Sequence, residues 1–170
     1  MTEVLVAAGS NVEPVANLRR ALDALARHYP GLCCSRAYRN AAVGFAGEDF
    51  VNLVLGFETG DDVSRVIGRL HEAEAACGRE RNAPKWAPRS MDLDILLYGD
   101  LVHEEPGLVL PRPDLARRPY MLGPAAELAP EFVHPVLGLT LGELWRRFDQ
   151  AAHPMRVIDI GWRADESRRS

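Results

Sequence analysis

Six apolar segments follow one another in an order that few folds can accommodate. Four are short apolar runs of the kind that forms buried strands, at 4–8, 33–39, 50–58 and 95–98. Two others repeat apolar residues at helical spacing and end near Pro30-Gly31 and Cys77-Gly78. The order strand, helix, strand, strand, helix, strand is typical of the split β-α-β arrangement. The sequence therefore predicts an α+β fold with a ferredoxin-like β-α-β-β-α-β core.

Turn residues and a C-terminal extension complete this outline. Gly9-Ser10-Asn11 follows the first strand and is expected to cap the first helix, and Thr59-Gly60-Asp61 is expected to cap the second. Beyond the core, the sequence predicts a loop with short helices, a further helix and an edge strand, at 111–128, 141–148 and 157–160. We expect a single domain over 1–162 and a frayed tail over 163–170.

Composition limits the classes of partner. The chain has 170 residues, enough for one domain that buries about 70% of the surface its unfolded form exposes. Its net charge of -4 offers no broad cationic surface, so no nucleic-acid partner is expected. The apolar stretches are too short for a bilayer and the first residues lack a signal-peptide pattern, so we expect a cytoplasmic protein without a membrane partner. The cysteines have neither disulfide nor zinc spacing and are expected to be reduced.

The segment 79–94 is suited to binding a polyphosphate together with a metal ion. Three arginines and the only lysine of the chain precede Asp92 and Asp94, which enter an apolar run. On a strand the two carboxylates share one face, roughly 7 Å apart, with Leu93 turned to the core. Hard oxygen ligands at this spacing can bind Mg²⁺, which takes further ligands from water and substrate phosphates. The guanidinium groups that can neutralise a triphosphate beside the metal are those of Arg79, Arg81 and Arg89.

An Asp-x-Asp pair alone has a simpler interpretation. A solvated basic loop followed by a strand with two exposed acids would explain the pattern without any function. The stiffened loop, with Pro84, Trp86 and Pro88, favours a site instead. The sole lysine, Lys85, lies in no Gly-x-x-x-x-Gly-Lys-Ser/Thr motif, so any phosphates must be held by arginine and metal rather than by a P-loop.

Motifs along most of the chain resemble those of a known family. They are Gly9-Ser10-Asn11, Phe50-Val51-Asn52, Gly78-Arg79-x-Arg81, Trp86-Ala87-Pro88-Arg89-Ser90-Met91-Asp92-Leu93-Asp94-Ile95, Leu110-Pro111 and Arg118-Pro119-Tyr120-Met121-Leu122. Together they resemble the 6-hydroxymethyl-7,8-dihydropterin pyrophosphokinase family of folate biosynthesis, from residue 4 to about residue 145. The resemblance implies transfer of diphosphate from ATP to the hydroxymethyl group of a reduced pterin, with release of AMP.

The resemblance also implies a role for each matching residue. Asp92 and Asp94 would bind two Mg²⁺ ions, and Arg79 and Arg89 would complete the catalytic set by steadying the phosphates. The ATP site would comprise Glu74, Arg79, Arg81, Trp86, Arg89, Ile95 and Arg112. The pterin site would comprise Asn40, Val43, Phe50, Asn52 and Tyr120, with the pterin ring between the two aromatic side chains. ATP would be the co-substrate, and a monomer is expected.

Three positions depart from the family pattern. The family commonly has Thr-Pro-Pro-Leu-Gly where this chain has Asn40-Ala41-Ala42-Val43-Gly44, at the expected pterin pocket. Arg112 stands where the family has a histidine, and Pro113 where it often has a polar or aromatic residue. These changes leave the expected metal and phosphate residues untouched. The nearest alternative is therefore a paralogue that acts on a related pterin.

Two alternatives come from other functional classes. A metal-dependent nucleotide-sugar transferase also uses Asp-x-Asp, although it normally needs a longer chain and releases a nucleoside diphosphate. A non-catalytic ferredoxin-like module would bind a small ligand without requiring Mg²⁺. The nucleotide product distinguishes a pyrophosphokinase from these two alternatives, because only diphosphate transfer from ATP is expected to yield AMP.

Overall fold

Three segments of the chain, residues 1–40, 49–78 and 90–163, are described by the computed structural model. Their elements, in chain order, are β1 (Thr2–Ser10), α1 (Pro14–Ala26), β2 (Cys33–Cys34), β3 (Ala37–Asn40), β4 (Phe50–Thr59), α2 (Val63–Ala76), β5 (Asp92–Tyr98), β6 (His103–Glu105), β7 (Leu108–Leu110), η1 (Pro113–Ala116), α3 (Pro119–Leu128), α4 (Leu141–Arg147) and β8 (Arg156–Ile158). Within these segments, no helix has the length and apolar character needed to cross a membrane.

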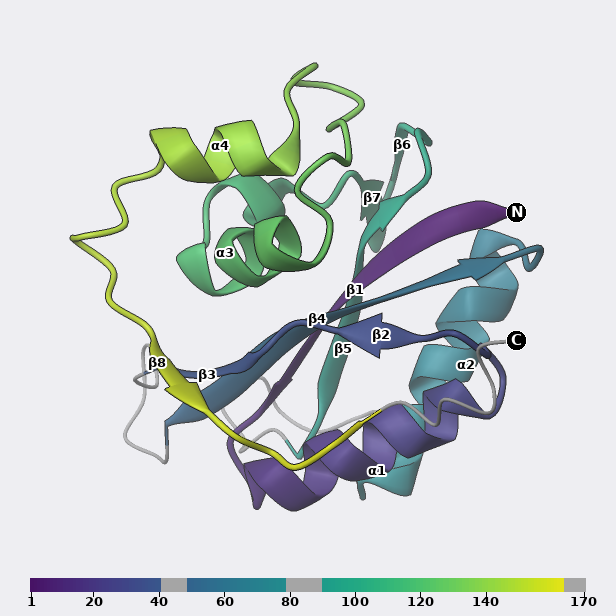
Figure 1. Ribbon diagram of the computed structural model, residues 1–170. Helices are drawn as coiled ribbons and strands as arrows, with labels where there is room; N and C mark the ends of the chain where they lie inside the picture. The colour runs from purple at the N-terminus through teal and green to yellow at the C-terminus, as the bar shows by residue number, and fades with distance from the viewer. Residues whose placement is uncertain (41–48, 79–89, 164–170) are drawn as a thin grey trace.

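An antiparallel sheet forms the middle layer of the molecule (Figure 1). Its strands lie in the order β5-β1-β4-β3-β8, and the short β2 pairs separately with β4. β1 is central, because it pairs with β4 along its whole length and with β5 from Val4 to Gly9. With α1 and α2 as the crossover connections, this order is the ferredoxin-like β-α-β-β-α-β arrangement. The predicted fold class is confirmed.

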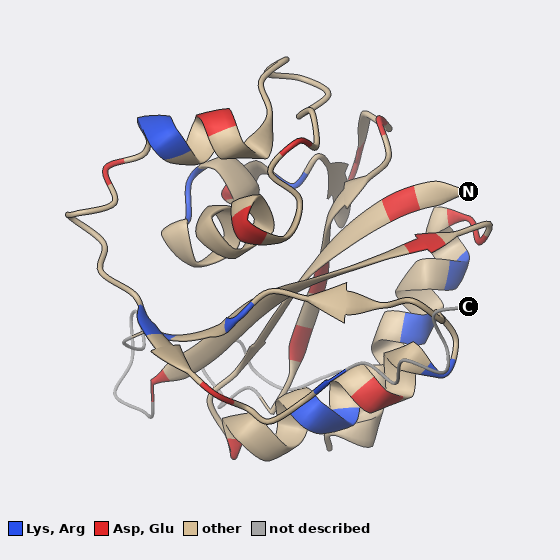
Figure 2. Cartoon of the chain, viewed as in Figure 1, with Lys and Arg blue, Asp and Glu red and all other residues tan. Residues whose placement is uncertain are grey.

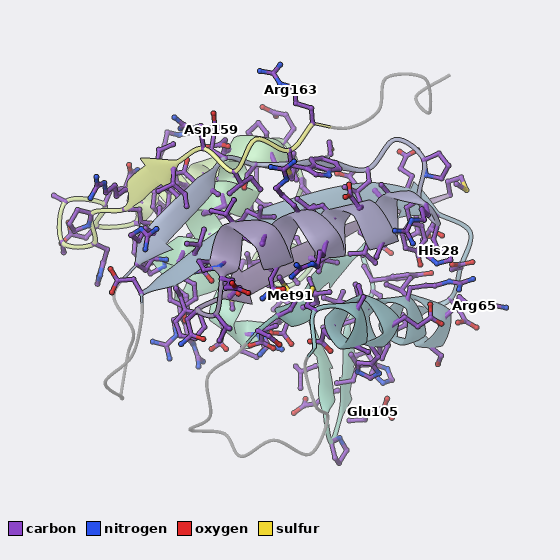
Figure 3. All side chains as sticks on the ribbon, turned by 90° about the horizontal axis from the view of Figure 1, so that it is seen from below. His28, Arg65, Met91, Glu105, Asp159 and Arg163 are labelled. Atoms are coloured by element: carbon purple, nitrogen blue, oxygen red, sulfur yellow. The ribbon has the colours of Figure 1, made fainter. Side chains whose placement is uncertain are left out.

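Helices α1 and α2 cover one face of the sheet, as the view from below shows (Figure 3). Their buried positions recur at helical spacing, as predicted, and include Leu18, Leu22 and Leu25 of α1. They pack with Val66 and Leu70 of α2 against the same side of the sheet. Because apolar burial is the main favourable term in folding, this layer is a principal source of stability for the sheet.

The C-terminal extension covers the opposite face (Figure 1). Here η1, α3 and α4 bury a second apolar cluster that includes Leu115, Leu122 and Leu141. The chain then returns through β8, which pairs with β3 at the edge of the sheet. The predicted short helices and edge strand are therefore present, and the molecule has three layers.

The structure corrects the sequence predictions at three places in the core. The run 33–39 is two strands, because Ser35 interrupts the ladder and its Oγ accepts a hydrogen bond from the Val54 N–H at 3.0 Å. The cap of α2 is Asp62, whose carboxylate accepts from the Arg65 N–H at 2.8 Å, one residue beyond the predicted turn. The hairpin of β6 and β7 was not predicted, because both strands are only three residues long.

The cap of α1 was also predicted wrongly. Gly9 and Ser10 belong to β1, and α1 begins instead at Pro14 after Glu13, which has φ 39 and caps without a side-chain hydrogen bond. Proline suits this first helical position because it has no N–H to satisfy and its φ is already helical. Ser10 is therefore the last residue of β1 and does not cap α1.

Glu127 ties α3 to the sheet. Its carboxylate accepts hydrogen bonds from the Tyr38 hydroxyl of β3, from the Arg36 backbone N–H at 2.6 Å and from the Arg36 Nε at 2.9 Å. Burial alone would raise the pKa of Glu127, but these hydrogen bonds outweigh it and the pKa lies below the ordinary glutamate value. On the other side of the bond, burial and the carboxylate raise the pKa of Tyr38 to about 12. The ionised form of Glu127 therefore holds α3 in place.

We predict that Glu127→Gln lowers the free energy of unfolding at pH 7 by about 1–2 kcal/mol, because charge-assisted hydrogen bonds become neutral ones. Since the pKa of Glu127 is lower in the folded chain, its contribution is present above the ordinary glutamate pKa and is lost as the pH falls through the folded value. Urea unfolding at pH 7 and at pH 3 should show a smaller difference between the wild type and the variant at the lower pH.

The matched control is Glu131→Gln, which removes an exposed carboxylate shortly after the same helix. Its free energy of unfolding should change by less than about 0.5 kcal/mol at either pH. A gap between wild type and Glu127→Gln that stays constant from pH 7 to pH 3 would contradict this account of the contact.

Candidate functional site

A row of three residues crosses the sheet at the end where the predicted site lies. In the ladders, Gly9 of β1 lies opposite Asn52 of β4 on one side and opposite Asp92 of β5 on the other. Directly paired residues project to the same face, so Asn52 and Asp92 flank Gly9 on the α3 side of the sheet. Neighbouring strands are about 4.8 Å apart, which places the Cα atoms of Asn52 and Asp92 roughly 10 Å apart across β1.

Gly9 leaves room in this row for the Asn52 side chain. A Cβ atom at Gly9 would lie 2.5 Å from Asn52 Oδ1, well inside van der Waals contact. The Asn52 amide therefore leans across the position where any other residue would carry a side chain. Beside it, the Ser10 hydroxyl donates to the Ser90 carbonyl at 2.7 Å and ties the end of β1 to the approach of β5.

The two aspartates occupy same-face positions on β5, as predicted. Asp92 and Asp94 are partly exposed, whereas Leu93 between them is 5% exposed and packs on the α1 and α2 side. Met91, labelled in Figure 3, is fully buried on that same side and anchors the start of the strand. In the charge-coloured view, acidic segments interrupt β5 at this end (Figure 2). Core packing of Met91 and Leu93 thus turns both carboxylates outward.

Glu74 of α2 supports the same strand from its outer side. Its side chain is 9% exposed, and Oε2 accepts a hydrogen bond from the Leu93 N–H at 2.9 Å. Since β5 is an edge strand, this N–H faces away from β1 and needs an acceptor outside the ladder. Glu74 therefore fixes the backbone between the two aspartates.

Arg112, which lies between β7 and η1, contacts Asp94. Its backbone N–H donates to the Leu96 carbonyl at 2.9 Å, at the point where the register between β5 and β1 shifts. Its guanidinium then lies with one nitrogen 3.4 Å from Asp94 Oδ1 and the other 3.8 Å from Asp114 Oδ2. Arg112 thus joins β5 to the start of η1 through a row of alternating charges.

A cavity of about 700 Å³ opens over this end of the sheet. Its floor includes Gly9, its acidic side includes Asp92 and Asp94, and the segment 152–155 forms a further wall. The remaining polar, charged and aromatic residues that line it are Asn40, Phe50, Asn52, Arg112, Asp114, Arg117, Arg118, Tyr120 and His153. One side therefore offers aromatic and amide groups, and the other offers carboxylates and guanidinium groups.

Tyr120 lies in the first turn of α3 and is half-buried between the cavity and the second apolar cluster. Burial raises the pKa of its phenol, so the hydroxyl is neutral at pH 7. A neutral aromatic ring that lines the cavity is suited to stacking on a flat heterocycle.

Seven of the predicted site residues line this one cavity, although they come from five parts of the chain. They are Asn40, Phe50, Asn52, Asp92, Asp94, Arg112 and Tyr120. Glu74 and Ile95 do not line it: Glu74 supports the edge of β5, and Ile95 is 6% exposed in the core on the α1 and α2 side. Their contacts with a nucleotide stay predictions. Five others lie outside the described residues and stay predictions too, namely Val43, Arg79, Arg81, Trp86 and Arg89.

Several cavity residues were not singled out from the sequence. Asp114 and Arg117 carry no local signal beyond their charge, and His153 is brought to the cavity only by the return of the chain toward β8. Arg118 directly precedes Pro119-Tyr120 within a motif that was recognised, so its position could have been inferred. Gly9 was interpreted as a turn residue, and only the register of β1 reveals its place in the site.

The carboxylates fit a divalent metal ion in type and position. They are hard oxygen ligands on alternate residues of one strand, they open onto the cavity, and Asp94 already accepts a guanidinium cation. Within the described segments, no cluster of three or more His, Cys, Asp or Glu side chains could hold a metal ion by itself. The remaining ligands would have to come from water and substrate, which is the usual arrangement for Mg²⁺ with a nucleotide.

Comparison with known proteins agrees with the geometry. The chain is 35% identical over 152 residues to the 2-amino-4-hydroxy-6-hydroxymethyldihydropteridine pyrophosphokinase of Synechocystis, covering 87% of this chain and 77% of the relative. The protein of the same name from Aquifex aeolicus is 31% identical over 145 residues, covering 84% of this chain and 90% of the relative.

Solved structures share the fold. The wild-type HPPK-DHPS of Plasmodium falciparum with STZ-DHP aligns with a TM-score of 0.65 at 14% identity, covering 86% of this chain. This chain spans 41% of the length of that protein. The model of the 7,8-dihydro-6-hydroxymethylpterin-pyrophosphokinase (HPPK) family matches residues 5–130. The chain therefore belongs to the 7,8-dihydro-6-hydroxymethylpterin-pyrophosphokinase family.

Proposed function

We propose that the cavity transfers diphosphate from ATP to the hydroxymethyl group of 6-hydroxymethyl-7,8-dihydropterin and releases AMP, in folate biosynthesis. Family membership supports a pyrophosphokinase, and it replaces the nucleotide-sugar transferase and the ligand-binding module as explanations. The observation that carries the proposal is the row Asn52, Gly9, Asp92, since it sets an amide that lies over Gly9 beside an acid on the neighbouring strand.

The Asn52 end of the row suits a pterin, the substrate that would accept the diphosphate. Phe50 and Tyr120 line the same cavity and offer two aromatic faces for the ring. An asparagine amide carries both a donor and an acceptor, as the edge of a pyrimidinone ring requires. Asn52 lines the cavity and would read that edge, and Asn40 Nδ2 is a buried donor with no hydrogen-bond partner among the described residues. A bound heterocycle could accept a hydrogen bond from Asn40.

The Asp92 end of the row suits the triphosphate of ATP, the diphosphate donor, together with magnesium. Asp92 and Asp94 would hold two Mg²⁺ ions, which would supply positive charge beside the phosphates. Arg112 supplies a guanidinium beside Asp94, and Arg79 and Arg89 are proposed to bind phosphate oxygens from outside the described residues. Glu74 acts through β5 by fixing the Leu93 backbone between the acids.

Transfer then depends on alignment. The pterin hydroxymethyl group would have to approach the β-phosphorus opposite the departing AMP. Phosphoryl-type transfer relies on in-line positioning and charge stabilisation, so the residues need not supply a strong general base. We further propose a cytoplasmic monomer that has no nucleic-acid or membrane partner.

The direct test is to mix the protein with ATP, Mg²⁺ and hydroxymethyl-dihydropterin and to separate the nucleotides. AMP and the pterin diphosphate should form in equal amounts, and chelation of Mg²⁺ should stop the reaction. ADP as the product would refute diphosphate transfer. Activity with a related pterin but not with this one would instead favour a paralogue, consistent with the altered sequence at 40–44.

Removing either acid should abolish turnover without unfolding the chain. We predict that Asp92→Asn and Asp94→Asn each lower kcat by roughly a thousandfold or more, because a metal ligand beside the developing charge is lost. Thermal unfolding should stay close to the wild type, since both side chains are partly exposed. Asp100→Asn, an exposed acid just beyond β5, is the control and should keep full activity. A variant at Asp92 or Asp94 with undiminished, metal-dependent turnover would refute the proposed metal site.

Adding one methyl group at Gly9 should damage pterin binding selectively. In Gly9→Ala the new Cβ would overlap Asn52 Oδ1, so the amide must turn away from the ring edge. Losing a hydrogen bond of this kind typically costs about 1–2 kcal/mol, and we predict a roughly tenfold rise in the pterin Kd with a much smaller change for a non-hydrolysable ATP analogue.

The control is Gly68→Ala on α2, where a Cβ would meet no atom within 4 Å. That variant should bind both ligands as the wild type does. Calorimetric titration of each ligand separates the outcomes, and an unchanged pterin Kd in Gly9→Ala would exclude Asn52 as the group that reads the ring edge.

A further inference from the structure

Arg112 already contacts one of the two proposed metal ligands. One guanidinium nitrogen lies 3.4 Å from Asp94 Oδ1, and the other lies 3.8 Å from Asp114 Oδ2. The three side chains are 29–39% exposed, so the pair is only partly screened by solvent. Asp94 therefore has a positive partner in the protein itself.

The position of Arg112 is fixed by its backbone rather than by the ion pair. Its N–H donates to the Leu96 carbonyl of β5 at 2.9 Å, and it is flanked by Leu110 and Leu115, which are 1% and 0% exposed. Asp114 gives the guanidinium a second carboxylate, which in turn lies 4.0 Å from Arg118 Nε. The guanidinium can therefore leave Asp94 while the Arg112 backbone stays beside β5.

Guanidinium and metal ion make competing demands on Asp94. Both bind carboxylate oxygens, and a guanidinium keeps its charge at every physiological pH, so it does not leave by losing a proton. It also pairs well with phosphate oxygens, to which it can donate two parallel hydrogen bonds. A nucleotide that brings both metal and phosphate offers each charged group a new partner at once.

We propose that Arg112 serves as an internal cation that occupies Asp94 in the substrate-free enzyme and transfers to the nucleotide phosphates as the metal binds. This proposal rests on the proposed function, because it takes ATP and a divalent metal as the ligands. Arg112 is then a positioning residue that couples the two binding events. Metal weakens the hold of Asp94 on Arg112, and phosphate removes Arg112 from the metal ligand.

Coupling of this kind is reciprocal. Whatever factor the nucleotide contributes to metal affinity, the metal contributes to nucleotide affinity, and typical factors are about 5–150. The substrate-free enzyme should consequently bind metal more weakly than the carboxylate pair alone would. Removing the guanidinium should strengthen metal binding in the absence of nucleotide and weaken nucleotide binding in the presence of metal.

The test measures binding rather than turnover. Mn²⁺ is titrated into the nucleotide-free full-length protein, and free Mn²⁺ is read by electron paramagnetic resonance. We expect Arg112→Gln to bind Mn²⁺ about tenfold more tightly than the wild type. A non-hydrolysable ATP analogue is then titrated with Mn²⁺ and with EDTA, and the ratio of its two affinities should be smaller in Arg112→Gln than in the wild type.

A second variant separates competition from simple charge. Arg117→Gln removes the same charge from the same cavity, but Arg117 has no ion pair with Asp94 in the described segments. Its Mn²⁺ affinity should rise by no more than about twofold. Equal increases in the two variants, or no increase in Arg112→Gln, would overturn the proposal.

These measurements are independent of the enzymatic assay. If the wild type releases AMP but Arg112→Gln binds Mn²⁺ no more tightly, the internal-cation role fails and the proposed function stands. If no AMP forms while Arg112→Gln shows the tighter Mn²⁺ binding, the competition stands and the proposed function fails. Thermal unfolding of Arg112→Gln is measured first, to check that the variant still unfolds cooperatively. If it does not, Arg112→Lys replaces it. Arg112→Lys keeps the charge but loses the guanidinium, and its Mn²⁺ affinity should rise by less than the increase expected for Arg112→Gln.

Discussion

The pairing of β1 with both of its neighbours is the constraint on which the site depends. Antiparallel register sets Gly9 opposite Asn52 and opposite Asp92, so residues forty positions apart face one space. A slip of one residue in either ladder would send one of these side chains to the α1 and α2 side. The apolar alternation of β5 opposes such a slip, because Leu93 would then leave the core. Stability of the sheet and geometry of the site therefore have the same cause.

The two layers that cover the sheet contribute differently. Helices α1 and α2 hold the strands from below, and Glu74 adds a polar contact that closes the exposed edge of β5 beside the acids. The C-terminal layer supplies the other wall of the cavity, with Tyr120 at the start of α3 and Arg112 before η1. Glu127 joins this layer to β3, so a contact remote from the acids helps to hold the helix that carries Tyr120. The ferredoxin-like core alone would give the acids but not the wall that faces them across the cavity.

Sequence reasoning was most successful where a local pattern has one physical solution. The alternation of Asp92, Leu93 and Asp94 allowed the outward face to be assigned, and helical spacing identified α1 and α2. It failed where geometry depends on tertiary contact. No local signal marks the shift of register near Leu96 that accompanies the Arg112 contact, the carboxylate of Glu74 at a strand edge, or the return of 152–155 to the cavity. Gly9 was assigned to a turn because its partner Asn52 is remote in sequence.

We propose that one row of the sheet holds the pterin and the metal at the strands on either side of Gly9. A crystal structure of the complex with hydroxymethyl-dihydropterin, a non-hydrolysable ATP analogue and Mn²⁺ tests it most directly, because manganese is located by its anomalous scattering. We expect manganese bound by Asp92 and Asp94, with the pterin ring between Phe50 and Tyr120 and its edge at Asn52. Manganese bound away from both aspartates, or a pterin seated outside this cavity, would contradict it.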